Sequence, residues 1–219
     1  MEVRRLAAKV LLTLLCAGAS ADESSDRTPI LDVHGWNGSD CYGDCIVDLE
    51  RQPWLALVPG HGGWTLVPTR LSFDNVETMG IHSSVEHAEF HLSHPALVAG
   101  HAETPNVRFK DQARAFYPGH VDPLRFSFHD RRYEFAVEGH ELVLRNANRK
   151  SSIGVVGGED YDDSDVLVLW AGDLDGDGEI DAIVHKTNTK NGQLCLLLSS
   201  ANEDPRALVS EVGCQFFSG

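Results

Sequence analysis

Hydrophobic and polar residues alternate with a period of two over much of residues 124–145. Apolar side chains occupy every second position of 124–128 and again of 133–137, with Asp130-Arg131 between the two runs. Glu138-Gly139 then precedes a third apolar run at 142–144. Because alternation places one set of side chains on one face of a strand, this region predicts an antiparallel meander with a buried face.

Three shorter apolar stretches nearer the N-terminus also predict strands. Residues 54–58 end at Pro59-Gly60, residues 63–67 end at Pro68, and residues 71–76 form the third stretch. Glycine, proline, asparagine and aspartate recur between such stretches along most of the chain. This rhythm of short apolar runs and turn residues is typical of a fold made of many short strands.

The last third of the chain has the character of buried strands. Residues 166–170 and 194–198 are almost continuously apolar, and residues 182–184 form a shorter apolar run between them. Asn191-Gly192 precedes the second long run and is a strong signal for a hairpin turn. We expect residues 209–217 to close the sheet.

Helix signals are few. The best candidate is residues 110–116, which Pro118-Gly119 limits to about two turns. The sequence therefore predicts a mostly β fold with antiparallel sheets in a sandwich- or meander-like arrangement and one or two short helices.

The N-terminus indicates export. Residues 1–9 form a short basic segment, and residues 10–15 are mostly apolar. Ala19-Ser20-Ala21 then forms a small-x-small cleavage site. This is the layout of a secretory signal peptide, and its apolar run is too short to span a bilayer. We expect a signal peptide at 1–21, a flexible leader at 22–29, and a single β-rich domain at 30–219. The predicted location is periplasmic or secreted, with no transmembrane segment.

Four cysteines follow the predicted cleavage site: Cys41, Cys45, Cys195 and Cys214. An even number in an exported protein suggests two disulfides, for which three pairings exist. We favour Cys41–Cys45 and Cys195–Cys214, because the members of each pair are close in sequence and the second pair fits across a hairpin. A zinc site is the weaker alternative, since no second closely spaced pair completes a ligand set.

The formal net charge is -15. Such an acidic surface repels phosphate backbones, which argues against a nucleic-acid partner. It favours metal cations and basic partners, although solubility alone is an alternative explanation.

The residues with the clearest chemistry lie at 173–181, between two apolar runs. Asp173, Asp175, Asp177 and Asp181 place four carboxylates within this segment. Ca²⁺ takes about six to eight oxygen ligands, and alternate spacing lets these side chains point inward around one ion. Gly176 and Gly178 permit the positive φ angles of a tight loop.

The flanks of this loop distinguish it from an EF-hand. An EF-hand requires a glutamate at the twelfth loop position, where Val184 stands, and it requires flanking helices rather than strands. The Asp-x-Asp-x-Asp-Gly-x-x-Asp pattern resembles the calcium loops of FG-GAP (integrin-α-like) repeats, and its surroundings are similar to a segment of uncharacterised exported bacterial proteins. The resemblance covers about residues 165–200. It implies a strand, a calcium loop and a strand, with Ca²⁺ held by the four aspartates.

Glu179 is the fifth candidate ligand in the same segment. We expect it to lend its backbone carbonyl to the ion while its side chain faces solvent. A loop of this kind is mostly structural, so the Ca²⁺ site itself predicts no substrate.

A histidine-rich segment within residues 82–101 offers the main alternative chemistry. On a strand, His87, Glu89 and His91 would share one face and suit Zn²⁺. The spacing is not that of a His-Glu-x-x-His metalloprotease, and the chain has no Gly-x-Ser-x-Gly nucleophile motif. A solvated polar face is the simpler interpretation.

These features favour a calcium-binding protein without catalytic activity that binds a protein or another ligand of the envelope. Two alternatives are a periplasmic immunity or inhibitor protein for a basic enzyme, and an exported hydrolase that uses the histidine-rich segment. We expect ligand binding on the polar and aromatic N-terminal part between Trp36 and His101, which includes Trp54, Trp64 and His91.

Overall fold

The computed structural model describes residues 29–32, 44–60, 63–74, 80–105, 114–117, 122–157, 164–188 and 190–218. Within these residues the chain forms antiparallel β-sheets and one short helix, α1 (Asp44–Arg51). This confirms the predicted mostly β fold. None of the helical structure in these ranges has the length and apolar character that a bilayer crossing needs. The predicted signal peptide, residues 22–28 of the leader, and Cys41 lie outside the described residues.

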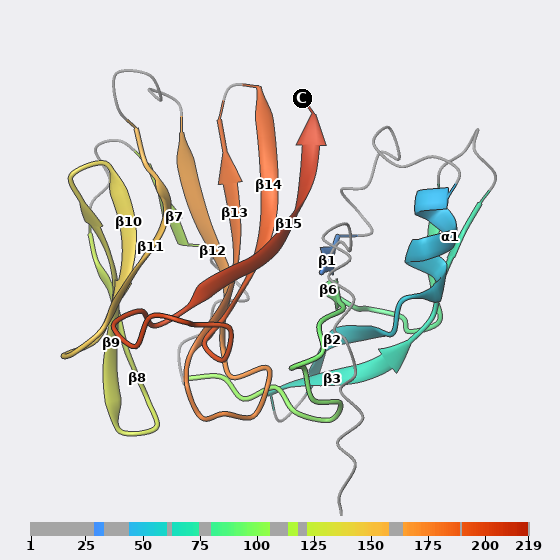
Figure 1. Ribbon diagram of the computed structural model, residues 1–219, viewed down its shortest axis with the longest axis horizontal. Helices are drawn as coiled ribbons and strands as arrows, with labels where there is room; N and C mark the ends of the chain where they lie inside the picture. Colours follow the sequence, from blue (N-terminus) through green and yellow to red (C-terminus); the bar gives the residue numbers. More distant parts are fainter. Residues whose placement is uncertain are drawn as a thin grey trace, which may run out of the picture.

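A five-stranded sheet occupies the middle of the molecule (Figure 1). Its order is β15-β14-β13-β12-β7, and its strands are β7 (Arg114–Phe116), β12 (Asp165–Gly172), β13 (Asp181–Thr187), β14 (Asn191–Leu198) and β15 (Ser210–Ser218). This region confirms the strands predicted in the last third of the chain.

Two four-stranded sheets flank the central one on opposite sides (Figure 1). One has the order β11-β10-β9-β8, with β8 (Leu124–Phe128), β9 (Arg131–Glu138), β10 (Glu141–Arg145) and β11 (Lys150–Val155). The other has the order β1-β6-β2-β3, with β1 (Ile30–Leu31), β2 (Trp54–Gly60), β3 (Gly63–Thr69) and β6 (Phe90–Leu92). In addition, β4 (Leu71–Phe73) and β5 (Ile81–Ser83) form a separate two-stranded sheet.

Both faces of the central sheet are buried. One face shares a core with the β8–β11 sheet, where Val166 and Val184 pack with Phe135 and Leu144. The other face shares a core with the β1-β6-β2-β3 sheet, to which Ile183, Leu194, Leu196 and Leu198 contribute. Residues that alternate between two cores must all be apolar, which explains the continuous apolar runs of this region.

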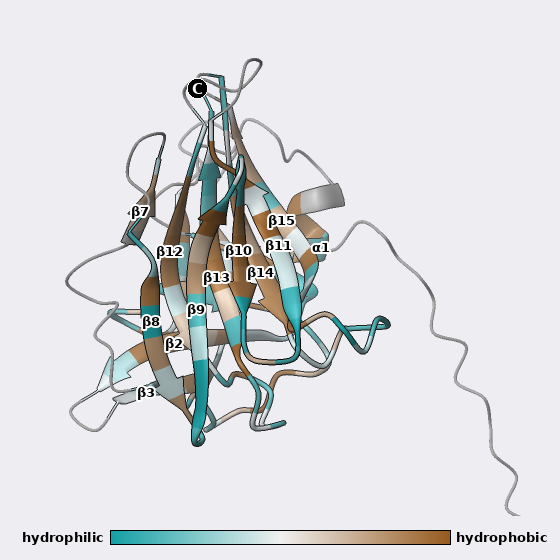
Figure 2. Cartoon of the chain, turned by 90° about the vertical axis from the view of Figure 1, so that its left-hand side faces the viewer, coloured by the Kyte–Doolittle hydropathy of each residue, from teal (hydrophilic) through white to brown (hydrophobic). Residues whose placement is uncertain are grey.

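The predicted meander at 124–145 is confirmed, with β11 as a fourth strand. Figure 2 views this sheet and shows the hydrophilic end of β9 next to its turn. The turn lies at His129-Asp130 rather than Asp130-Arg131, and both residues have positive φ values, 44° and 61°. Arg131 begins β9 and pairs with Phe128. A two-residue turn with positive φ at both positions matches the twist of a hairpin, and asparagine or glycine is its usual signal.

Two prolines and the Asn-Gly pair were wrongly predicted to end or separate strands. Pro59 and Pro68 lie inside β2 and β3, paired with Trp64 and Leu55. The β6 strand pairs with β2 only at 55–57, and β3 is an edge strand, so neither proline interrupts a ladder on both sides. Asn191 and Gly192 do not form the turn itself. They are the first two residues of β14.

The predicted helix at 110–116 is wrong over its described part. Residues 114–116 form β7, which pairs with β12 at 166–168. Phe116 is fully buried in the core between the central and β8–β11 sheets. A helix of two turns has little stability of its own, so pairing with an available sheet edge outweighs its local preference.

Residues 29–32 lie against the last strand of the central sheet. The Asp32 amide donates to Oε1 of Gln215 over 2.8 Å, and these residues are 183 positions apart. Gly213 has a positive φ of 151°, and an added Cβ there would lie 2.7 Å from the Pro29 ring. The beginning of the β-rich domain is thus held by β15.

The Cys195–Cys214 disulfide joins β14 to β15 and confirms that predicted pair. We expect the double variant Cys195→Ala/Cys214→Ala to lose about 3 kcal/mol of unfolding free energy, because the bond closes a loop with a sequence separation of 19. Urea denaturation measures this difference. Peptide mapping of unreduced protein is the control, and recovery of Cys195 and Cys214 as free thiols would contradict the assignment. Cys45 lies in α1, but its side chain is outside the described set.

Candidate metal centre

The acidic loop connects β12 to β13 across the end of a paired hairpin. Gly172 pairs with Asp181, so the two ends of the loop are held side by side by the ladder. Gly176 and Gly178 have φ values of 83° and 77°, as the sequence predicted. The chain therefore curls tightly between two fixed strands.

Three of the predicted ligands converge. Asp173, Asp175 and Asp177 each place one carboxylate oxygen in a group whose three atoms lie within 4.8 Å of one another. Asp173 is almost fully buried, Asp175 is partly buried, and Asp177 is exposed. The group is therefore open to solvent on one side and backed by the fold on the other.

Hydrogen bonds from the backbone hold each of these carboxylates. Asp173 accepts from the amides of Gly176 over 2.6 Å and Gly178 over 2.9 Å. Asp175 accepts from the Asp177 amide over 3.2 Å, and Asp177 accepts from the Glu179 amide over 2.8 Å. The loop thus orients its own acidic side chains inward.

The convergence has an electrostatic cost. Burial raises the pKa of Asp175, a hydrogen bond from Ser200 opposes this, and the nearby charge of Asp177 raises it further. A bound cation would relieve both the desolvation and the repulsion between carboxylates. Clustered carboxylate oxygens suit a hard cation, and the residues present therefore fit Ca²⁺.

Asp181 lies at the start of β13 and is fully buried. Its Oδ2 accepts from the Leu174 amide over 2.7 Å, and its Oδ1 accepts from the Ser199 amide over 2.8 Å. Burial raises the pKa of Asp181 well above its usual value, and the charge of Asp175 adds to this effect. Asp181 thus joins the loop to the end of β14, and its direct ligation of an ion stays a prediction.

The side chain of Glu179 does not face solvent, which corrects that expectation. It is 20% exposed and forms ion pairs with Arg131 and Arg149. The Tyr133 hydroxyl donates to the same carboxylate over 3.3 Å. Burial acts to raise the pKa of Glu179, but the two arginines outweigh it and the pKa is lowered. Its side chain therefore belongs to a neighbouring charged network, while its backbone remains in the loop.

Ser199 and Ser200 are the main residues of the site that sequence reasoning missed. Ser199 Oγ lies 2.8 Å from Asp177 Oδ2 and 3.0 Å from Asp181 Oδ1, and Ser200 Oγ donates to Asp175. Both serines directly follow β14, whose neighbour β13 begins at Asp181. Their only signal in the sequence is their place at the end of an apolar strand.

A second missed element covers the start of the loop. The amides of Glu103 and Asp173 each donate to the carbonyl of the other, over 2.9 and 2.7 Å. His101 Nε2 lies 3.1 Å from an Asp173 carboxylate oxygen, and His129 is hydrogen-bonded to Glu103. This contact spans about seventy residues of sequence between Glu103 and Asp173, so no local pattern announces it.

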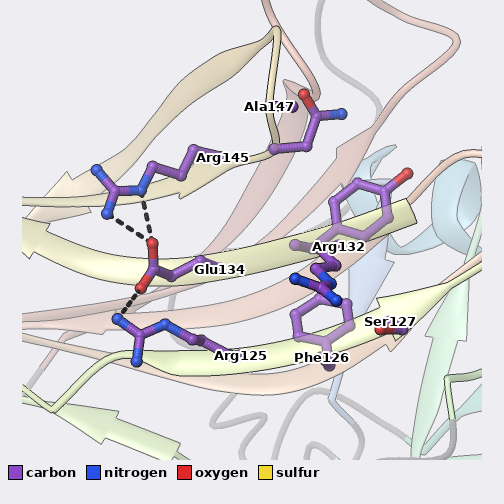
Figure 3. Close-up of a pocket in the computed structure, with 9 residues that line it drawn as sticks. Arg125, Phe126, Ser127, Arg132, Glu134, Arg145 and Ala147 are labelled. Atoms are coloured by element: carbon purple, nitrogen blue, oxygen red, sulfur yellow. Dashed lines mark hydrogen bonds and ion pairs between the residues drawn. The ribbon is translucent and has the colours of Figure 1, made fainter. Parts of the chain in front are cut away.

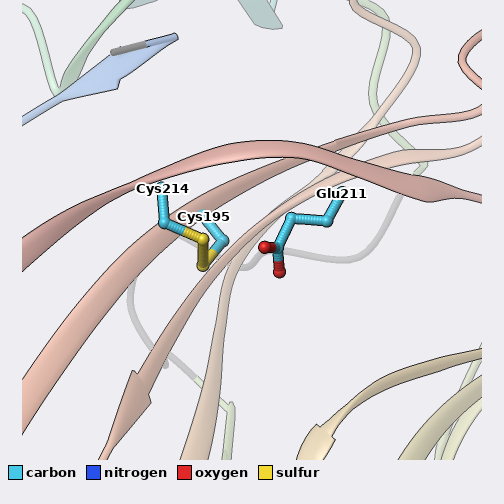
Figure 4. A group of neighbouring side chains, drawn as sticks. All are labelled: Cys195, Glu211 and Cys214. Atoms are coloured by element: carbon cyan, nitrogen blue, oxygen red, sulfur yellow. A yellow bond between two sulfur atoms is a disulfide. The ribbon is translucent and has the colours of Figure 1, made fainter. Parts of the chain in front are cut away.

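A further group with metal-ligand chemistry contains Cys195, Cys214 and Glu211. Figure 4 shows the two sulfur atoms joined to each other beside the Glu211 side chain. A disulfide offers no thiolate, and Glu211 pairs with Lys186 over 2.5 Å. This group therefore serves as a cross-link and not as a zinc site.

The histidine-rich segment does not present the predicted shared face. His87 is exposed with a positive φ of 61° and precedes β6, while His91 is fully buried within β6. His91 Nε2 lies 2.8 Å from Ser83 Oγ. Of residues 86–94, only 90–92 form a strand, so the period-two argument does not apply to His87.

Two residues expected on an N-terminal binding surface belong instead to the interior. Trp54 is 1% exposed, and its indole N–H donates to the Leu49 carbonyl over 2.6 Å. His91 is likewise buried. Trp64 is half-buried against the core between the central and β1-β6-β2-β3 sheets.

No family model matches this chain. No curated protein matches it, and no solved structure matches it.

Proposed function

We propose that this chain is an exported calcium-binding protein without catalytic activity, in which a structural Ca²⁺ ion stabilises the β12–β13 hairpin. The convergence of the Asp173, Asp175 and Asp177 carboxylates carries this proposal. The basic and apolar N-terminal segment supports export to the periplasm or the medium. The ion would supply positive charge to the loop, and the carboxylate oxygens of the loop would coordinate it.

The remaining contacts of the loop support a structural role for the ion. Asp173 and Asp181 are buried, and hydrogen bonds connect them to the loop backbone and to the end of β14. A cation at the three clustered carboxylates would therefore lock the loop to two neighbouring strands. We propose that the protein uses this stabilised scaffold to bind a ligand of the cell envelope.

Ca²⁺ is expected to raise the thermal stability of the mature protein. An ion that binds only the native state stabilises it by about 2.7 kcal/mol at a free concentration of a hundred times its dissociation constant. The double variant Asp175→Asn/Asp177→Asn should lose this response, because it removes two of the three clustered carboxylates. Calorimetric titration and melting curves in Ca²⁺ and in chelator measure both quantities.

Glu203→Gln is the matched control, since Glu203 is exposed and lies outside the loop. This variant should retain the full response to Ca²⁺. A wild-type melting temperature that is the same in Ca²⁺ and in chelator would contradict the proposed calcium site.

A further inference from the structure

Three adjoining hollows lie on the β11-β10-β9-β8 sheet and around its end. Their volumes are about 580, 480 and 780 Å³, and all three are lined by Asn146 and Ala147 in the turn after β10. The third hollow extends to Asp130 in the β8–β9 turn and to Glu179 of the acidic loop. They form one continuous surface, which we call the arginine face.

This face is basic in a strongly acidic protein. The chain has 18 lysines and arginines against 33 aspartates and glutamates. The basic residues that line the hollows are Arg125, Arg131, Arg132, Arg145, Arg149, Lys150 and Arg206. The acidic residues that line them are fewer: Asp130, Glu134, Glu138 and Glu179. Positive charge is therefore concentrated on the arginine face, although the protein as a whole is acidic.

Ion pairs hold most of these cations in place. Figure 3 shows Glu134 between Arg125 and Arg145, at distances of 2.7 and 2.6 Å. Glu138 pairs with Arg145 and Lys150. These acidic groups fix the orientation of the longer side chains, which lowers the entropy lost when a ligand binds.

Arg132 and Arg206 differ from the ion-paired arginines of this face. Both side chains are exposed, and within the described part of the chain neither guanidinium has an acidic partner. Arg132 lines the first and third hollows, and Arg206 lines the second and third. The Arg206 carbonyl accepts from the Lys150 amide over 2.9 Å, which fixes its loop beside β11.

The free guanidinium groups define the chemistry of the ligand. A guanidinium presents planar pairs of N–H donors that match a carboxylate or sulfate group. Two such groups on one surface suit a ligand with several separated negative charges. Neutral hydrogen-bonding side chains line the same hollows, namely Ser127, Asn146, Asn148 and Ser152.

The same surface offers little to an apolar ligand. The large exposed hydrophobic side chains of the described residues are Val47, Val98, Tyr117, Val155 and Phe216, and none of them lines the hollows. The rings of Phe126 and Tyr133 line the first hollow, but both side chains are almost fully buried. Peptides and membranes usually gain affinity from apolar anchors, whereas a sugar chain offers hydroxyl groups and charges. The arrangement therefore favours a charged carbohydrate.

We propose that the arginine face binds an acidic oligosaccharide, whose carboxylate or sulfate groups are held by Arg132 and Arg206. The choice of an extracellular polymer rests on the proposed export of the protein. The anion site itself rests on the arginines, and it requires no ion in the acidic loop.

The test is a binding titration of the full mature chain in chelator, below its melting temperature. Polygalacturonate and dextran sulfate are the carboxylate and sulfate probes, and neutral dextran is the reference. Arg132→Gln/Arg206→Gln is expected to weaken binding of at least one acidic probe tenfold or more. Arg51→Gln/Lys190→Gln removes the same charge at exposed positions away from the face and should change binding less than twofold.

The outcomes separate this proposal from the calcium proposal. Binding in chelator that depends on Arg132 and Arg206 supports the arginine face, whatever Ca²⁺ does to the melting temperature. Equal losses in the two double variants would show a net-charge effect and overturn the assignment. Tighter, arginine-dependent binding to polyglutamate or to vesicles of phosphatidylglycerol would overturn it in favour of a peptide or a membrane. Failure to bind either acidic glycan would overturn it as well.

Discussion

Replacing Gly172 with alanine is expected to destabilise the protein by about 3 kcal/mol or more, because a well-packed position must accept an additional carbon. Gly172 is the last residue of β12 and directly precedes Asp173. A Cβ atom there would lie 2.1 Å from the Glu103 carbonyl oxygen and 2.6 Å from the Trp170 ring. Trp170 is fully buried, so its ring has no room to move aside.

The same change should also weaken the candidate metal centre. The Glu103 carbonyl accepts from the Asp173 amide, and displacement of this carbonyl would break the bridge that covers the start of the loop. Chemical denaturation in chelator measures the loss of stability, and a Ca²⁺ titration measures the loss of affinity.

Gly60→Ala is the matched control for Gly172→Ala. Gly60 also ends a strand, is exposed, and would place its new Cβ at an ordinary 3.4 Å from the Gly63 carbonyl. We expect a change within about 0.5 kcal/mol there. A Gly172→Ala protein as stable as Gly60→Ala would show that the Glu103 segment is not packed against β12 as described.

The second large effect is expected at Asp181. The Asp181→Ala variant leaves the buried amides of Leu174 and Ser199 without acceptors, which should cost about 3 kcal/mol even in chelator. Asp175→Ala should cost much less in chelator, because its carboxylate is only partly buried and is repelled by its neighbours. Both variants should lose part or all of the response to Ca²⁺.

This comparison separates support of the fold from ligation. Urea denaturation of the two variants and the wild type, each in chelator and in Ca²⁺, provides the necessary values. If Asp181→Ala and Asp175→Ala are equally stable in chelator, then the hydrogen bonds of Asp181 do not carry the structural role assigned to them.

The sequence predicted the acidic loop because its chemistry is local. Its aspartates and glycines fall within residues 173–181, and a hairpin is enough to bring Asp173, Asp175 and Asp177 together. Alternation likewise revealed β8 and β9, in which buried and more exposed side chains take turns, and a short apolar run revealed β10. Period and spacing report such features directly.

The surroundings of the site could not be predicted in the same way. The partners of Glu179 lie 48 and 30 residues away in the sequence, at Arg131 and Arg149. Ser199 and Glu103 reach the loop through strand pairing and a backbone bridge. Such contacts depend on the three-dimensional arrangement of the sheets, which no local pattern encodes. The strand at 114–116 was missed for the same reason, since its partner β12 lies far along the chain.

The contact between residues 29–32 and β15 has a consequence for folding during synthesis. A ribosome releases Ile30 long before Gln215, and the two regions are joined by a hydrogen bond across 183 positions. The β1-β6-β2-β3 layer also shares its core with Leu194, Leu196 and Leu198 of the central sheet. The first layer to emerge therefore has no complete interior until β14 and β15 have been synthesised, and it can finish folding only at the end of synthesis.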